Sequence, residues 1–127
     1  MTIATLLRAA LTGDTAVAAI VSTRIYPVKL PQTPTYEAIS YARVSNTERN
    51  GSTALRETRF QINCWADTYI KAGALAAAVK TALEGYTNTS QTPGIKMALV
   101  VNELDDYDDE VKVYREIVDV ILTTTGD

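Results

Sequence analysis

The chain has 127 residues, 46% of them hydrophobic and 21% charged, so we expect a single domain, residues 1–127, that buries a two-layer core without disulfides or metal. Its net charge of −3 argues against a nucleic-acid-binding surface spread over the whole domain, although a local basic patch stays open. The lack of histidine removes Ser-His and Cys-His nucleophile pairs and the commonest zinc ligand. We therefore expect neither a cofactor nor a metal.

The N-terminal residues favour a protein made in the cytosol. Arg8 comes early and no long apolar core follows, so we expect no signal peptide and no membrane-spanning segment. The single cysteine, Cys64, cannot form an internal disulfide. Its place in an apolar row predicts a buried thiol in a reducing compartment.

The first part of the chain predicts two helices, a short strand and a loop. Apolar residues at helical spacing predict a helix that ends near Thr12-Gly13, and Asp14 can cap a second, shorter helix. Residues 23–26 predict a strand, and the proline-rich stretch 27–34 predicts an extended, ordered loop. The apolar positions of the two helices are Ile3, Leu6, Leu7, Ala10 and Leu11, then Val17, Ile20 and Val21.

Two strands with a polar turn between them follow. Residues 38–45 predict a strand with apolar residues on both faces, and the polar stretch 46–52 contains Asn-Gly, a strong turn signal. In residues 56–66 apolar and polar side chains alternate, which predicts a sheet with one face on a core and the other in solvent or on a partner. The inner set is Phe60, Ile62, Cys64 and Ala66, and the outer set is Arg59, Gln61, Asn63 and Trp65.

The remainder predicts a main helix and two more strands. Asp67 and Thr68 can cap a helix over residues 69–83, and Gly85 can end it in a left-handed conformation. After a polar connector, strands are expected over residues 95–104 and 111–123, separated by an acidic turn at 105–109. The last strand is apolar on both faces or bulged midway, which makes its second side a candidate contact with another subunit.

This order of elements predicts the α+β class. Consecutive strands with short polar turns favour antiparallel pairing. We expect a mixed, mainly antiparallel sheet of about five strands, with two N-terminal helices and one main helix packed on one face.

Two groups of residues are candidate sites. The outer set of residues 59–65 is either an ordinary polar face with Trp65 tucked under a loop, or a partner-facing patch, because Trp and Arg are favoured interface anchors. The acidic run from Asp105 to Glu110 lacks the alternating ligands and central glycine of a calcium loop, which favours a solvated turn over a metal site.

Several segments, in this order and spacing, resemble one phage protein family. They are residues 6–11, the Asp14 helix, Arg24-Ile25-Tyr26-Pro27 before a proline-rich loop with Pro31-Gln32, the strand 56–66 and the helix 69–83. The sequence thereby resembles the tail terminator (tail completion) proteins of long-tailed bacteriophages and prophages, also described as minor tail or head-tail joining proteins. The likeness is detailed over residues 6–83 and holds in outline for the last strands.

The resemblance implies a non-enzymatic structural protein of the virion, placed at the neck end of the tail and made in the host cytoplasm. Such proteins form a ring, typically a hexamer, that ends polymerisation of the tail tube and docks the head-tail connector. The implied partners are further copies of the chain, the major tail tube protein and the connector or stopper protein. DNA would pass through the ring without specific binding, and an acidic lumen would repel it.

The residues expected to serve this role fall into two groups. We expect subunit or tube contacts from Arg24, Tyr26, Arg59, Gln61, Asn63 and Trp65. We expect two loops to face the lumen or the tube, one with Asn46, Glu48, Arg49 and Asn50, the other with Asp105, Asp106, Asp108 and Asp109.

Three other functions compete with this one. A head-completion or stopper protein of the neck would also lack catalytic residues. A small non-catalytic α+β binding module would need a concave pocket with convergent polar groups, and the sequence shows no such set. An enzyme would have to use carboxylates, lysine or tyrosine, such as Glu57 with Arg59, but no residues are spaced as an acid/base pair.

Overall fold

The structure is a computed structural model and describes residues 2–48, 55–90 and 93–125. Its elements in chain order are α1 (Ile3–Thr12), α2 (Thr15–Val21), β1 (Ile25–Pro27), β2 (Ala38–Glu48), β3 (Leu55–Ala66), α3 (Tyr69–Leu83), β4 (Gly94–Asp108) and β5 (Val113–Thr125). The five strands form one sheet in the order β1-β2-β3-β5-β4. β1 runs parallel to β2, and the other neighbours are antiparallel. The predicted α+β class and mainly antiparallel sheet are confirmed.

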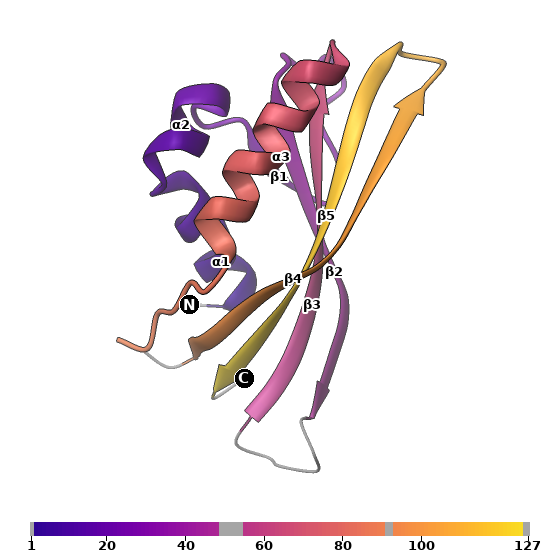
Figure 1. The fold of residues 1–127 in the computed structure, drawn as a ribbon. Helices are drawn as coiled ribbons and strands as arrows, with labels where there is room; N and C mark the ends of the chain where they lie inside the picture. The colour runs from indigo at the N-terminus through magenta and orange to yellow at the C-terminus, as the bar shows by residue number, and fades with distance from the viewer. Residues whose placement is uncertain (1, 49–54, 91–92, 126–127) are drawn as a thin grey trace.

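All three helices lie on one side of the sheet, as Figure 1 shows, and the core fills the space between the two layers. α3 crosses the sheet diagonally, while α1 and α2 pack beside it. The alternation predicted for β3 is confirmed, because its apolar set points into this core. The largest fully buried side chains are Phe60, Ile3, Leu6, Leu7, Leu11, Ile25, Ile39, Ile62, Leu75, Leu83, Ile95 and Leu122.

Side-chain caps begin α2 and α3 where the sequence predicts. The Asp14 carboxylate accepts hydrogen bonds from the backbone N–H groups of Ala16 and Val17, at 3.0 and 3.1 Å. The Thr68 hydroxyl accepts from the N–H of Lys71 at 3.2 Å. After α3, Gly85 has the predicted positive φ of 75°, and its N–H donates to the Ala98 carbonyl at 3.0 Å, which ties the end of the helix to β4.

Two hairpins are longer than predicted. β4 continues to Asp108, so the turn between β4 and β5 is formed by residues 109–112 and not by 105–109. Residues 105–108 stay extended because β5 pairs with them, with Arg115 opposite Asp106 and Tyr114 opposite Tyr107.

The strand β2 also continues past its predicted end at Ser45, to Glu48. The Asn46 side chain holds this extension, since its Oδ1 accepts hydrogen bonds from Arg56 Nε and Thr58 Oγ1 at 3.2 and 3.1 Å. The predicted Asn50-Gly51 turn lies outside the described residues.

The final strand β5 is apolar on both faces, whereas the irregularities lie in its neighbour. Val118, Val120 and Leu122 enter the core beneath the helices, and Ile117 is buried on the opposite face. The pairing of β4 with β5 shifts register between Ile95 and Met97 and again between Val100 and Asn102. Of the two alternatives for the last strand, apolar on both faces or bulged midway, the structure therefore shows the first.

Within the described residues, no single helix is long and apolar enough to cross a membrane. The test by length and composition is passed only by α1 and α2 taken together, as a pair bent by 83°.

Candidate functional site

The face of the sheet that points away from the helices is the candidate site, which we call the open face. Cross-strand register places its side chains in rows. The rows, from β2 to β4, are Ala38-Trp65-Arg115-Asp106, Ser40-Asn63-Ile117-Leu104, Ala42-Gln61-Asp119-Asn102, Ser45-Arg59-Ile121-Leu99 and Thr47-Glu57-Thr123-Met97. The predicted outer set of β3 thus lies in the middle of this face. The β2 side chains on one side of it are small, and the β5 side chains on the other side are larger and include both charged and apolar residues.

The polar side chains at the centre of the open face bond to one another. Arg59 forms an ion pair with Asp119 on β5, with 2.8 Å between Nη2 and Oδ2. Gln61 donates to the side-chain oxygen of Asn63 at 3.3 Å, and Asn63 is only 7% exposed. The sequence does not reveal Asp119 as the partner of Arg59, because this pairing depends on the β3–β5 register. These side chains already bond to each other within the sheet. They therefore offer fewer free hydrogen-bond donors and acceptors to another protein than their residue types suggest.

Trp65 lies between the loop after β1 and the β4–β5 hairpin. Its Nε1 donates to Ser40 Oγ at 3.0 Å, and the Arg115 guanidinium sits 5.2 Å from the centre of its ring. Trp65 and Arg115 also help to line a hollow of about 340 Å³ with Val28, Pro31 and Val111 at its sides. The first interpretation of Trp65, a ring tucked under a loop, therefore describes its position, but the ring still borders an open depression.

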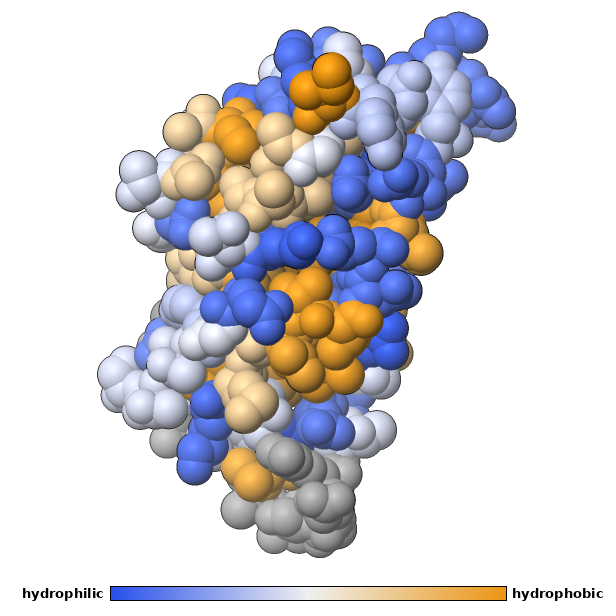
Figure 2. Space-filling view, in the orientation of Figure 1, coloured by the Kyte–Doolittle hydropathy of each residue, from blue (hydrophilic) through white to orange (hydrophobic). Residues whose placement is uncertain are grey.

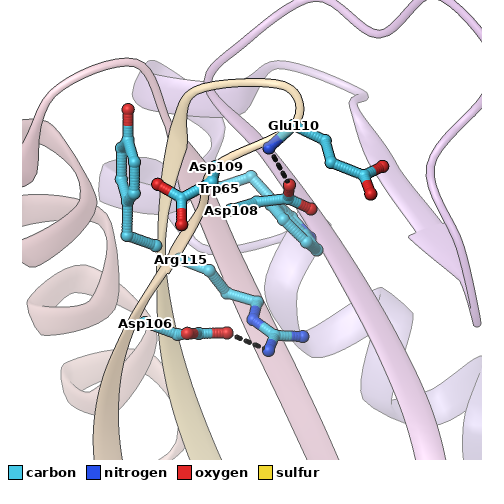
Figure 3. A pocket seen from close by; sticks show the side chains of 7 residues that line it. Trp65, Asp106, Asp108, Asp109, Glu110 and Arg115 are labelled. Carbon is cyan, nitrogen blue, oxygen red and sulfur yellow. Dashed lines mark hydrogen bonds and ion pairs between the residues drawn. The ribbon is translucent and has the colours of Figure 1, made fainter.

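The acidic hairpin forms a second hollow of about 390 Å³, shown in Figure 3. Asp106 pairs with Arg115, and this hydrogen bond holds the pKa of the Asp106 carboxyl below its ordinary value. Asp108 accepts from the backbone N–H of Glu110 at 3.0 Å and so shapes the turn. Among the described residues, no group of three or more acidic or cysteine side chains could hold a metal ion. The acidic cluster forms a charged surface, and Asp108 within it stabilises the turn.

Three tyrosines on the helix side of the same hairpin were not expected from the sequence. The rings of Tyr107 and Tyr114 are 4.7 Å apart, and those of Tyr69 and Tyr114 are 5.9 Å apart. The Tyr69 hydroxyl donates to Asp105 at 2.9 Å, which raises the pKa of that tyrosine. Tyr69 and Tyr107 are 55% and 41% exposed, so they add an aromatic surface to the acidic hairpin.

Carboxylates also gather where β4 and β5 pass under α3. Lys80 of α3 and Glu103 of β4 form an ion pair of 2.8 Å, which raises the pKa of the lysine. Glu116 lies beneath the same helix. Partial burial, followed by repulsion from Asp105 and Glu103, raises its pKa although Lys80 opposes the shift.

The other predicted contact residues have structural roles or lie apart from the open face. Arg24 braces the loop before β2, donating from Nε to the Glu37 carbonyl at 2.7 Å and from Nη2 to the Ile20 carbonyl at 3.2 Å. Tyr26 is half-buried on the edge strand β1, with β2 between it and the β3 row. Glu48 ends β2, and Arg49 and Asn50 lie outside the described residues. The structure does not bring these residues and the β3 row into one patch.

Exposed apolar side chains on β4 are the feature that sequence reasoning missed. Five of the ten large exposed hydrophobic residues of the described chain lie on this one strand, at 40–51% exposure. Figure 2, which views β4 from its outer edge, shows a contiguous apolar patch below the middle of α3. The available signal was the unbroken apolar run 97–101, because an edge strand of that composition cannot bury every side chain. The five residues are Met97, Leu99, Val101, Leu104 and Tyr107.

The chain matches a known protein family in sequence and a virion protein in structure. The chain matches the family described as tail completion protein gp17 over residues 5–125. Among solved structures it is similar to a chain of the virion of a native gene transfer agent particle, with a TM-score of 0.80, 20% sequence identity, and coverage of 94% of this chain and 92% of the other. No curated protein matches the sequence. The chain therefore belongs to the tail completion protein family of phage structural proteins.

Proposed function

We propose that the protein forms a ring, most simply a hexamer, on the last tier of the phage tail tube, ends tube polymerisation there and provides the docking surface for the head-tail connector. The observation that carries this proposal is the one-sided construction of the domain. All three helices cover one face of the sheet, while the other face and the β4 edge expose apolar and aromatic side chains. Such surfaces are typical of proteins that bury them against partners.

The distribution of these exposed residues supports two kinds of contact. Val28, Val111, Tyr69 and Ile70 lie at the end of the molecule that carries the β4–β5 turn, whereas Met97, Leu99, Val101 and Leu104 follow the side of β4. A ring needs contacts around its circumference and contacts along the tail axis. We assign the first group to the tail tube or connector and the second to neighbouring copies.

The charge distribution supports passage of DNA through such a ring. Residues 103–110 include six carboxylates and no cation. If this hairpin borders the lumen, like-charge repulsion keeps the DNA backbone from adhering during passage. The neck end of the virion tail is accordingly the proposed location, reached after synthesis in the host cytoplasm.

Electron microscopy of particles made with and without the gene tests the proposal. Without the protein we expect DNA-filled heads beside separate tails of irregular, over-extended length. Tails of normal length beside leaky heads would assign the protein to the head side of the neck, as a completion or stopper protein. Intact particles would refute any role in the joint.

A further inference from the structure

The sheet leaves two stretches of strand edge open on its opposite sides. The connector after α3 covers the first part of β4, because Asn88 pairs with Ile95, Gly85 donates to Ala98, and the Glu84 side chain accepts from the Val100 N–H. Beyond Val100, residues 101–108 have no further strand on their outer side in the described chain. On the opposite side β1 pairs with β2 only from Ile39 to Tyr41, so among the described residues nothing pairs with residues 42–48 on their outer side.

Each open stretch also exposes apolar side chains. Val101, Leu104 and Tyr107 are 40%, 50% and 41% exposed on β4, and Val44 is 51% exposed on β2. Open edges with apolar side chains and unpaired backbone groups tend to pair with another chain. Two such edges on one subunit are the arrangement that a head-to-tail contact needs.

The charges of the two hairpins identify a second copy of this chain as the occupant. The hairpin that contains the open part of β2, residues 42–59, has four arginines and two glutamates. The hairpin segment that contains the open part of β4, residues 103–116, has seven carboxylates and two cations. The edges of two neighbouring copies therefore attract each other, whereas two β4 edges would repel.

The strand directions permit this contact between copies in the same orientation. β2 is antiparallel to β3, β3 to β5, and β5 to β4, so β4 runs opposite to β2. β4 of one copy beside β2 of the next continues the antiparallel order of the sheet. Within one copy, the open part of β2 lies level with the first half of β4, whereas the open part of β4 is its second half. Pairing the two open parts therefore shifts neighbouring copies relative to each other along the strand direction. A stagger with tilted strands is what a sheet needs in order to close on itself.

We propose that residues 101–108 of β4 dock antiparallel on residues 42–48 of β2 in the next copy, and that this edge contact joins the subunits laterally. The inference rests on the proposed ring and names the surface that closes it. Register shifts between Arg43 and Ser45 and between Val100 and Asn102 interrupt both edges. Such irregularities weaken pairing in dilute solution, so the contact forms where the end of the tail concentrates the subunits.

Cysteine cross-linking in assembled particles tests the contact. Thr47→Cys and Val101→Cys, which come close together when residues 101–108 run antiparallel to residues 42–48, are introduced singly and together. Particles are then treated with a short thiol–thiol cross-linker; Cys64 is buried and does not interfere. The double variant should give a ladder of linked copies up to the ring size, and particles with both single variants mixed should give linked dimers only. Either single variant alone should stay monomeric. Absence of the ladder, or links to a different protein, would overturn the assignment.

Two matched controls separate edge contact from general proximity and from charge alone. Val28 is 71% exposed, and its N–H bonds to the Tyr41 carbonyl just before residues 42–48, at the end of this stretch far from the position opposite Val101. Val28→Cys with Val101→Cys should therefore not form a ladder. Arg43→Glu in the double-cysteine protein should reduce linking severalfold, whereas Lys96→Glu, the same charge change on the covered part of β4, should not. Equal losses in both would contradict the proposed charge pairing.

Failure of this inference can be distinguished from failure of the proposed function. Over-extended tails in particles lacking the gene, together with no ladder, would keep the terminator role and reject the edge contact. Tails of normal length without the gene would reject the terminator role, and a ladder found in that case would still assign the edge contact.

Discussion

At the scale of single residues, Trp65 connects three parts of the chain that are distant in sequence. Its indole N–H bonds to Ser40 on β2, its ring receives Arg115 from β5, and its edge borders the loop after β1. Each contact adds little alone, but together they hold the loop and the hairpin in fixed positions around one hollow.

Trp65→Phe should therefore lower the free energy of unfolding by about 1 kcal/mol, because the Ser40 hydroxyl loses its partner while an aromatic ring remains over Arg115. Urea unfolding followed by circular dichroism measures the change. Ser40→Ala is the matched variant, since it removes the same hydrogen bond from the other side. If Trp65→Phe is as stable as the wild type, the hydrogen bond does not contribute to folding.

Glu116 is a second residue whose surroundings decide its effect. Its folded pKa is above the ordinary value of 4.5, mainly because of partial burial and then because of Asp105 and Glu103. A raised pKa means that the stabilisation from protonated Glu116 is present below the unfolded pKa and is lost as the pH rises through the folded pKa.

We accordingly expect Glu116→Gln to melt at a higher temperature than the wild type at pH 7, with a difference that shrinks toward pH 4. Thermal unfolding at several pH values checks this expectation. Glu110→Gln, in the exposed turn, is the control and should leave the melting temperature unchanged. A constant difference between Glu116→Gln and wild type across the pH range would contradict the argument.

At the scale of elements, helix starts follow closely from the sequence because capping is local. Asp14 satisfies two open N–H groups of α2, a helix of only 7 residues. Asp14→Ala should lower the free energy of unfolding by about 1 kcal/mol. Asp67→Ala, which removes only an exposed ion pair with Lys71, should change it by much less. Denaturant unfolding of the two variants provides the comparison. Equal losses in the free energy of unfolding would show that the Asp14 cap stabilises the fold no more than an exposed ion pair does.

Strand ends are harder to predict because they depend on the partner strand. Residues 105–108 have the composition of a turn, but Arg115 and Tyr114 on β5 keep them in the ladder. Likewise Asn46 favours a turn locally and is instead bonded by Arg56 and Thr58. Period-two alternation correctly assigned the inner and outer faces of β3, whereas the pair Arg59–Asp119 and the tyrosine cluster required the register, which no local pattern encodes.

At the scale of the whole molecule, charge is separated between two hairpins while the core beneath the helices stays apolar. The acidic hairpin is therefore suited to a role outside the fold. Changing Asp105, Asp106, Asp108 and Asp109 to Asn together should leave the domain folded, because none of these side chains belongs to the apolar core.

The same variant should disturb tail assembly or DNA passage, which phage titre and microscopy measure. Asp106→Asn alone is a useful control, since it loses only the Arg115 ion pair. A normal titre with all four changes would remove the acidic hairpin from the proposed mechanism, and loss of the circular dichroism signal would show a structural role instead.

The β4–β5 turn also makes the protein a natural substrate for limited proteolysis. The hairpin projects beyond the rest of the sheet in Figure 1, and Lys112 stands exposed in its turn with a φ of 58°. Projecting turns of this kind are preferred sites of nicking. Trypsin should therefore cut the free subunit first after Lys112. A subunit whose hairpin is buried in an assembled neck should resist cleavage at this position. The digestion pattern of a sample would thus report how much of the protein has been incorporated into particles.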